Sequence, residues 1–227
     1  VKNSNIALNI FALKNILVQD SLFDETTATV PISNMLVVQI RPPVDQADNV
    51  GLNGKVQNVY VLRTTVSNST ANLASNGQLI AMLLNYIDNV VVKECIFSNL
   101  TGNSTSNILR VRGLGTISAS NYTIQDCQFF GITSTAPLCS FLEGYHASGT
   151  PPVNFIEQNC IRNCISHNII GPGVTVQGYQ LLYCKNLIID NCVAQKIYNT
   201  LVLDKSSSSI SCSGFFLNGT SNPSNAN

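Results

Sequence analysis

The nonapeptide Asn89-Val-Val-Val-Lys-Glu-Cys-Ile-Phe97 decides the fold of this chain. It holds an Asn, three apolar residues, two polar residues, a small residue, a variable residue and an apolar one. The pattern returns at Asn121–Phe129 and Asn186–Ala194, and in weaker form from Asn15 and Asn58. Successive starts lie 43, 31, 32 and 65 residues apart, and 65 is two periods of about 32. We therefore predict a repeat protein.

The copy missing from this series falls in residues 153–168, where two registers compete. One places Cys160 in the small position and turns Arg162 inward. The other places Cys164 there, buries no charge, and spaces the copies by 37 and then 28 residues. We favour the second, because an unpaired buried charge costs several kcal/mol whereas a longer loop costs little.

A second set of apolar segments alternates with these copies, and none has a helical period. A unit of two or three short strands cannot bury its apolar face alone, but stacked units can. We predict an all-β fold, a single-stranded parallel β-helix (β-solenoid) with six to seven rungs of about 32 residues. It forms one domain over residues 1–227, with repeats over about 12–215 and a flexible Ser/Asn-rich tail over 216–227. The second set comprises Met35–Ile40, Leu79–Leu84, Ile108–Val111, Leu138–Leu142, Val174–Leu182 and Leu201–Leu203.

Equivalent residues of a solenoid stack at the strand spacing, about 4.8 Å. Asn tolerates tight-turn geometry and its amides can bond along the stack, so we predict an Asn ladder. Cys is compact and apolar, so we predict an interior Cys column. The predicted ladder residues are Asn15, Asn58, Asn89, Asn121 and Asn186, and the column residues are Cys95, Cys127, Cys164 and Cys192.

The motif Asn-x-x-(Val/Ile)-x-(Asp/Asn/Glu)-Cys-x-(Phe/Ala) resembles the repeat of the right-handed parallel β-helix family, which includes pectate lyases and phage tailspikes. The resemblance covers roughly residues 12–215 and implies a right-handed coil, as the general rule for parallel crossovers also does. It implies little about function, since this family hosts lyases, hydrolases, adhesins and scaffolds. The chain lacks the Asp-Asp, Gly-His-Gly and Arg-Ile-Lys segments of the family's enzymes.

The charge content excludes some functions. Lys plus Arg is 12 and Asp plus Glu is 12, so no basic excess exists to neutralise phosphates, and we expect no nucleic-acid partner. No apolar run approaches the roughly 18 residues of a membrane span. Charged residues make up 11%, and small polar residues replace them, including 28 Asn. Zero net charge with few charges favours association.

Two groups of side chains are candidates for chemistry. The position before the small residue of each copy holds Asp20, Glu94, Asp126 and Asn191, and acids stacked on adjacent rungs could bind a cation. Arg63 interrupts that series, so we predict a solvated turn and no metal or cofactor. Glu143, Tyr145 and His146 form the densest polar cluster, which suits acid–base work or sugar binding. A loop after the strand 138–142 is the simpler interpretation of that cluster.

The eight cysteines show no paired zinc spacing. We expect free buried thiols in the column. Cys139, Cys184 and Cys212 lie off it and are candidates for disulfides, with Cys160 as a further partner. Sequons mark Asn68, Asn99, Asn103 and Asn218 as glycosylation candidates if the chain enters a glycosylating pathway.

The ends of the solenoid carry no convincing cap: the segment 6–13 is short and apolar, and the other end runs into the tail. Open ends favour burial by a partner, so we expect self-association, head to tail or as a trimer. We predict a non-enzymatic structural subunit of a filament, fibre or virion or cell-envelope assembly, located outside the cell or on a cell or virion surface. The alternatives are a carbohydrate-binding adhesin or a polysaccharide lyase or glycoside hydrolase. Exposed tyrosines would favour the adhesin, with candidates Tyr60, Tyr145, Tyr179 and Tyr198.

Overall fold

The computed structural model describes residues 6–11, 14–42, 55–103, 105–113, 120–134, 138–146, 159–171, 175–182, 187–199 and 211–218. Every regular element within these ranges is a β-strand, and every strand pair is parallel. The prediction of an all-β protein with parallel strands is therefore confirmed. No helix that could cross a membrane occurs in this part of the chain.

The strands form three stacks. The first stack contains β2 (Lys14–Gln19), β5 (Val56–Leu62), β8 (Ile87–Lys93), β11 (Ser120–Gln125), β14 (Asn159–Arg162) and β17 (Leu187–Asp190). The second contains β3 (Leu22–Asp24), β6 (Thr65–Ser67), β9 (Ile96–Gly102), β12 (Gln128–Ser134), β15 (Ile165–Gly171) and β18 (Val193–Asn199). The third contains β1 (Ile6–Phe11), β4 (Thr27–Arg41), β7 (Thr70–Asn85), β10 (Thr105–Gly113), β13 (Leu138–His146), β16 (Thr175–Leu182) and β19 (Ser211–Asn218).

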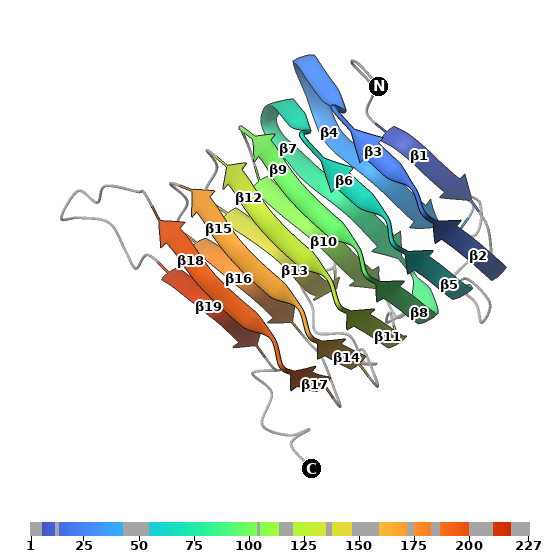
Figure 1. Ribbon diagram of the computed structural model, residues 1–227. Coiled ribbons are helices and arrows are strands. Elements are labelled where there is room, and N and C mark those ends of the chain that lie inside the picture. The colour runs from blue at the N-terminus through green and yellow to red at the C-terminus, as the bar shows by residue number, and fades with distance from the viewer. Residues whose placement is uncertain are drawn as a thin grey trace.

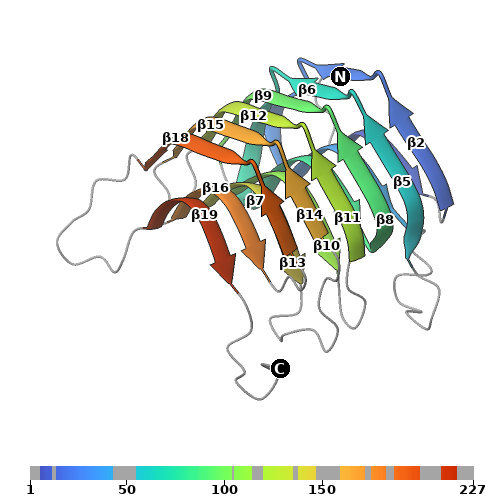
Figure 2. The same ribbon diagram turned by 60° about the horizontal axis from the view of Figure 1, so that its bottom comes forward.

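The chain visits the stacks in turn, so each strand pairs with the strands three places before and after it in sequence. Figure 1 shows the colour running steadily from blue to red along the stacks, and Figure 2 shows the stacks as facing layers. The first stack is a six-stranded sheet. The second and third form a 13-stranded sheet, because β7 pairs with β9 at one end and with β10 at the other.

The core lies between the layers. It is built from columns of side chains that occupy the equivalent position in successive strands of a stack. Val61, Val92, Ile124 and Ile161 are register partners in successive strands, and each is fully buried. Phe97 and Phe129 form a second column, with ring centroids 5.0 Å apart and planes at 5°. β-Branched and aromatic side chains suit such columns because they pack well against the same residue type one strand away.

Three columns of left-handed residues bend the chain at five-residue intervals. Each member has a φ between 46° and 65°. Non-glycine residues seldom adopt this conformation, and Asn tolerates it best. The first bend column is Asn15, Asn58, Asn89 and Asn121. The second is Asp20, Arg63, Glu94, Asp126, Asn163 and Asn191. The third is Glu25, Asn68, Asn99, Gly131, Asn168 and Lys196.

The copy within residues 153–168 takes the register that buries Cys164. Ile161 and Ser166 point inward and Arg162 is exposed. Asn163 follows Asp126 by 37 residues in the second bend column, and Asn191 follows Asn163 by 28. Avoidance of a buried charge therefore selects this register, and the longer connection is tolerated.

Three segments differ from the expected boundaries. The residues 143–146 continue β13 and do not form a loop. β19 extends to Asn218, so part of the predicted tail is a strand. β1 pairs with β4 and provides a seventh strand for the third stack. The predicted strand 201–203 lies outside the described residues.

Candidate functional site

The first bend column forms an amide ladder. Asn58 Nδ2 donates to Asn15 Oδ1 at 3.0 Å, and Asn89 Nδ2 donates to Asn58 Oδ1 at 2.7 Å. The ladder changes partner at Asn121, whose Nδ2 donates to Asp88 Oδ1 at 2.8 Å instead of to Asn89. The left-handed conformation holds each of these side chains along the stack, so the amides serve the fold. Asn186 lies outside the described residues.

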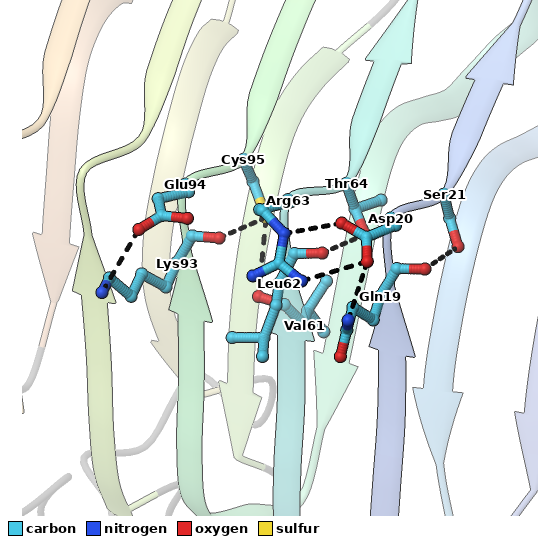
Figure 3. A network of polar contacts seen from close by, with 10 residues as sticks. All are labelled: Gln19, Asp20, Ser21, Val61, Leu62, Arg63, Thr64, Lys93, Glu94 and Cys95. Carbon is cyan, nitrogen blue, oxygen red and sulfur yellow. Dashed lines mark hydrogen bonds and ion pairs between the residues drawn. The ribbon is translucent and has the colours of Figure 1, made fainter.

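The second bend column contains the charged residues that the sequence analysis considered as a possible cation site (Figure 3). Arg63 reaches back to Asp20, with Nε–Oδ1 at 2.6 Å and Nη2–Oδ2 at 3.0 Å. The hydrogen bonds from Arg63, followed by that from Gln19, lower the pKa of Asp20 to about 2. A bidentate guanidinium is the strongest partner that a carboxylate finds among side chains. Arg63 therefore occupies the oxygens that a cation would need.

The remaining acids of this column also have protein partners. Lys93 Nζ lies 3.2 Å from Glu94 Oε1, and Asn163 Nδ2 donates to Asp126 Oδ1 at 2.9 Å. Asn191 continues the series by donating to Asn163 Oδ1 at 3.0 Å. Within the described residues, no group of three or more His, Cys, Asp or Glu side chains has metal-binding geometry.

A column of small residues follows the second bend column by one position. Every member donates through its hydroxyl or thiol to the carbonyl oxygen two residues earlier, at 2.9 to 3.3 Å. The bend turns that carbonyl toward the next side chain, and only a short side chain with a donor hydrogen can use it. The members are Ser21, Thr64, Cys95, Cys127, Cys164 and Cys192.

The four cysteines of this small-residue column are free thiols. Cys95, Cys127 and Cys164 are buried, and Cys192 is half-buried at the end. The neighbouring thiols of Cys164 and Cys95, together with burial, raise the pKa of Cys127 well above its usual range. A buried protonated thiol is a poor nucleophile. The column therefore fills space and bonds to the backbone, and it offers no reactive sulfur at its centre.

Two of the expected disulfide pairings outside the column are excluded by the described residues: any with Cys160, and the one between Cys139 and Cys212. Cys160 is a free thiol that accepts a hydrogen bond from Arg162 Nε at 3.3 Å. The register places Val176 between Cys139 and Cys212, which makes them two strands apart. Two strand spacings are about 10 Å, beyond the roughly 7 Å that a disulfide spans. Cys184 lies outside the described residues.

The third bend column contains two of the sequon asparagines. Asn68 Nδ2 donates to Asp24 Oδ1 at 2.9 Å, and Asn99 Nδ2 donates to Asn68 Oδ1 at 3.0 Å. Ser67 also donates to Asp24 Oδ1, at 2.6 Å, and these hydrogen bonds lower the pKa of Asp24. Asn68, which directly follows β6, and Asn99 in β9 are bonded neighbours along the stack, where two bulky glycans would collide.

The other two sequon asparagines lie outside the bend columns. Asn103 Nδ2 donates to Asn72 Oδ1 at 3.1 Å, so it too takes part in an amide pair. Asn218 is the last residue of β19. Its side chain lies outside the described part.

The expected polar cluster lies on one strand of the third stack. Glu143, Tyr145 and His146 belong to β13, and their register partners in β10 are Arg110, Arg112 and Gly113. Their side chains lie outside the described part. The backbone therefore brings two arginine positions beside the cluster, which sequence spacing did not indicate.

The aromatic candidates for sugar binding whose side chains are described do not gather on one surface, and the side chain of Tyr145 lies outside the described part. Tyr179 is buried and stacks on Phe215, with ring centroids 4.6 Å apart. Tyr60 belongs to the first stack and Tyr198 to the second, and both are exposed. Phe130 and His167, which are partly exposed, stack in parallel at 5.1 Å on adjacent strands. Among the side chains that the structure describes, this last pair is the one that resembles a small aromatic platform.

Sequence reasoning missed the third bend column, although Asn89 and Asn99 already show its ten-residue offset from the first.

Comparisons with protein-family models, with curated proteins and with solved structures found no match.

Proposed function

We propose that this chain is a right-handed parallel β-helix of six to seven rungs that serves as a non-enzymatic structural subunit. Its assembly is a filament, a fibre or a virion or cell-envelope layer outside the cell. The return of the chain to each stack after three parallel strands supports the helix, and the general handedness of parallel crossovers supports a right-handed one.

The observation that supports the structural role most strongly is that the polar side chains bond to one another and to the backbone. Amides, carboxylates and small donors of the bend columns bond to the same position one strand away, or to the backbone beside them. An enzyme site needs polar groups that converge on a substrate and leave bonding capacity for it. Side chains that are mutually satisfied along the stack stiffen a rod instead.

Electron microscopy of the protein from its native source, with mass analysis of the same sample, tests this proposal. We expect rods or a larger particle that contains this chain. A screen against polysaccharides, read by reducing ends and by ultraviolet absorbance of unsaturated products, should show no turnover. Isolated monomers that cleave a polysaccharide would contradict the structural role.

A carbohydrate-binding adhesin is the second candidate, favoured by the parallel stack of Phe130 on His167. Aromatic faces on adjacent strands provide the apolar body that sugar rings contact. A glycan array separates the two candidates. Binding that is lost in Phe130→Ala and retained in Tyr60→Ala, an exposed aromatic elsewhere, would establish the adhesin.

A further inference from the structure

We propose that a second copy of this chain docks head to tail, with its β2 and β3 on β17 and β18 of the first copy, and that its β1 must leave β4 for this contact to form. The inference rests on the proposed structural function and deepens it. It names the partner as a second copy and β1 as the strand that controls growth.

The two ends present strand edges of matching direction. In the part of the chain that the structure describes, β2 pairs with β5 alone and β3 with β6 alone. At the other end, β17 pairs with β14 alone and β18 with β15 alone. All these pairs are parallel, so a second copy placed beyond β17 and β18 repeats the relation that already joins neighbouring strands. Unpaired edges of this kind are templates for a further strand.

Exposed apolar side chains lie at matching positions of the two ends. Leu17 in β2 is 60% exposed, and Ile188, at the opposite end of the same register column, is 55% exposed. Leu22 in β3 and Val193 in β18 share another column and are 67% and 42% exposed. Continuation of the stack places Leu17 on Ile188 and Leu22 on Val193 and covers part of each side chain. Tyr60 and Ile165, which have neighbours on both sides in these outward-facing columns, remain 39% and 38% exposed.

One column of the solenoid carries opposite charges at its two ends. The third bend column begins with Glu25 and ends with Lys196, and both are exposed. A head-to-tail contact brings the carboxylate of one copy beside the ammonium of the other. A head-to-head contact joins two ends that both lack Lys196, so Glu25 does not gain this partner. The charges therefore favour the head-to-tail orientation.

The third stack does not fit this continuation as it stands. Counted over the described residues, it holds seven strands, whereas the first and second stacks hold six each. When β2 and β3 of the second copy follow β17 and β18 of the first, β4 of the second copy follows β19 of the first. β1 of the second copy, which pairs with its β4, would then lie where β19 of the first copy already is. Both strands cannot occupy that position, so one has to move.

Of the two strands, β1 is bound less tightly to the rest of the sheet than β19 is. It has six residues, against eight for β19. Phe11 in β1 is 47% exposed, and its ring is covered by the Arg41 guanidinium at 4.6 Å. In β19, Phe215 stacks directly on the buried ring of Tyr179. β1 therefore caps the third stack in the single copy, and its release opens the end for growth.

Charge reversal in the full chain tests the contact. Light scattering and electron microscopy are used to compare wild type, Lys196→Glu, and the double variant Glu25→Lys/Lys196→Glu. We expect Lys196→Glu to assemble about three- to tenfold less well, because repulsion replaces attraction at an exposed pair. The double variant should recover wild-type assembly. Lys93→Glu, the same change in β8, the third of the six strands of the first stack, is the matched control and should assemble as wild type does.

A substitution in β1 tests its role as a cap. Phe11→Ala removes the contact with Arg41 and should speed assembly about two- to fivefold, the factor that an exposed cation–π contact is worth. Circular dichroism verifies that each variant is folded.

Two results would overturn the inference: equal assembly of the wild type and both charge variants, or no gain in rate with Phe11→Ala. Particles in native material that are insensitive to all these changes would leave the structural function standing and refute only the head-to-tail contact.

Discussion

At the scale of single residues, the left-handed positions set the shape of the backbone. Sixteen described residues other than glycine have a positive φ, and nine of them are Asn. Tyr86 is the one of the sixteen that lies outside the three bend columns. The conformation costs most residues about 1–2 kcal/mol, and the amide bonds along the columns offset that cost. Arg63 has no such amide and is held by Asp20 instead.

Substitutions at Asn58 separate the backbone effect from the ladder. Both Asn58→Ala and Asn58→Gly remove the bonds to Asn15 and Asn89. Gly accepts a positive φ and Ala resists it, so we expect the Ala variant to be about 1 kcal/mol less stable than the Gly variant. Urea unfolding followed by circular dichroism measures both. Equal losses would mean that the ladder alone matters.

The Asp20–Arg63 pair predicts a dependence of stability on pH. The pKa of Asp20 falls from 3.8 to about 2 in the folded chain, so its contribution to stability is present above pH 4 and is lost as the pH falls toward 2. We expect Asp20→Asn to be less stable than wild type at pH 7 and nearly equal to it at pH 2. Thermal unfolding across this range measures the difference. Arg63→Met should show the same convergence, and a gap that stays constant with pH would contradict the pair.

At the scale of the elements, the small-residue column joins the first stack to the second. Its two N-terminal members carry hydroxyls, and the following four carry thiols. A thiol keeps the donor hydrogen that the bent backbone needs and is better suited than a hydroxyl to apolar surroundings. The column therefore combines a backbone cap with a core position.

The position of each thiol predicts its reactivity. Cys95, Cys127 and Cys164 are buried, whereas Cys160 lies in an outward-facing column beside Arg162. We expect iodoacetamide at pH 8 to label Cys160 in the folded protein and to spare the three buried thiols. Peptide mass spectrometry measures the labels, and the same treatment in urea is the control. Labelling of Cys127 at the rate of Cys160 would show that the interior opens readily.

Gly131 interrupts the amides of the third bend column. Its φ is 65°, and an added Cβ would lie 2.7 Å from Asn99 Oδ1, the end of a side chain that can rotate. Asn accepts this conformation and can bond to Asn99, so we expect Gly131→Asn to stabilise the chain by about 0.5–1 kcal/mol. Gly131→Val should destabilise it, since a β-branched residue resists a positive φ. Urea midpoints of the two variants measure the effect, and a loss in both would show that the column has no room there.

At the scale of the whole molecule, the protein is a chain of contacts between neighbouring strands. A linear stack is expected to open from its ends, because end strands have one neighbour instead of two. Hydrogen exchange should be slowest in β8, β9, β11 and β12, and fastest in β1, β17 and β18. Mass spectrometry of peptides measures this gradient. Uniform protection would instead indicate a single cooperative unit.

The sequence predicted the parallel all-β fold because inward positions repeat residue types that stack, as Cys95 and Cys127 do. It did not predict the full bend columns, since Arg63 and Lys196 occupy left-handed positions that their residue types disfavour. Neighbouring strands impose those conformations, and the pattern of single residues does not report them. β1 was missed as a strand for a similar reason: it lacks the repeated Asn and is recognised only by its pairing with β4.

The constant five-residue spacing of the bends also bears on how such a chain can change over generations. Equivalent positions in successive copies are separated by 43, 31, 32, 37 or 28 residues, so the connecting segments have absorbed insertions and deletions. A single residue inserted between two bends would displace every later column of that copy. The fold should therefore tolerate the duplication of a whole copy more readily than the insertion of one residue within a copy. Related chains should accordingly differ in length by complete repeats.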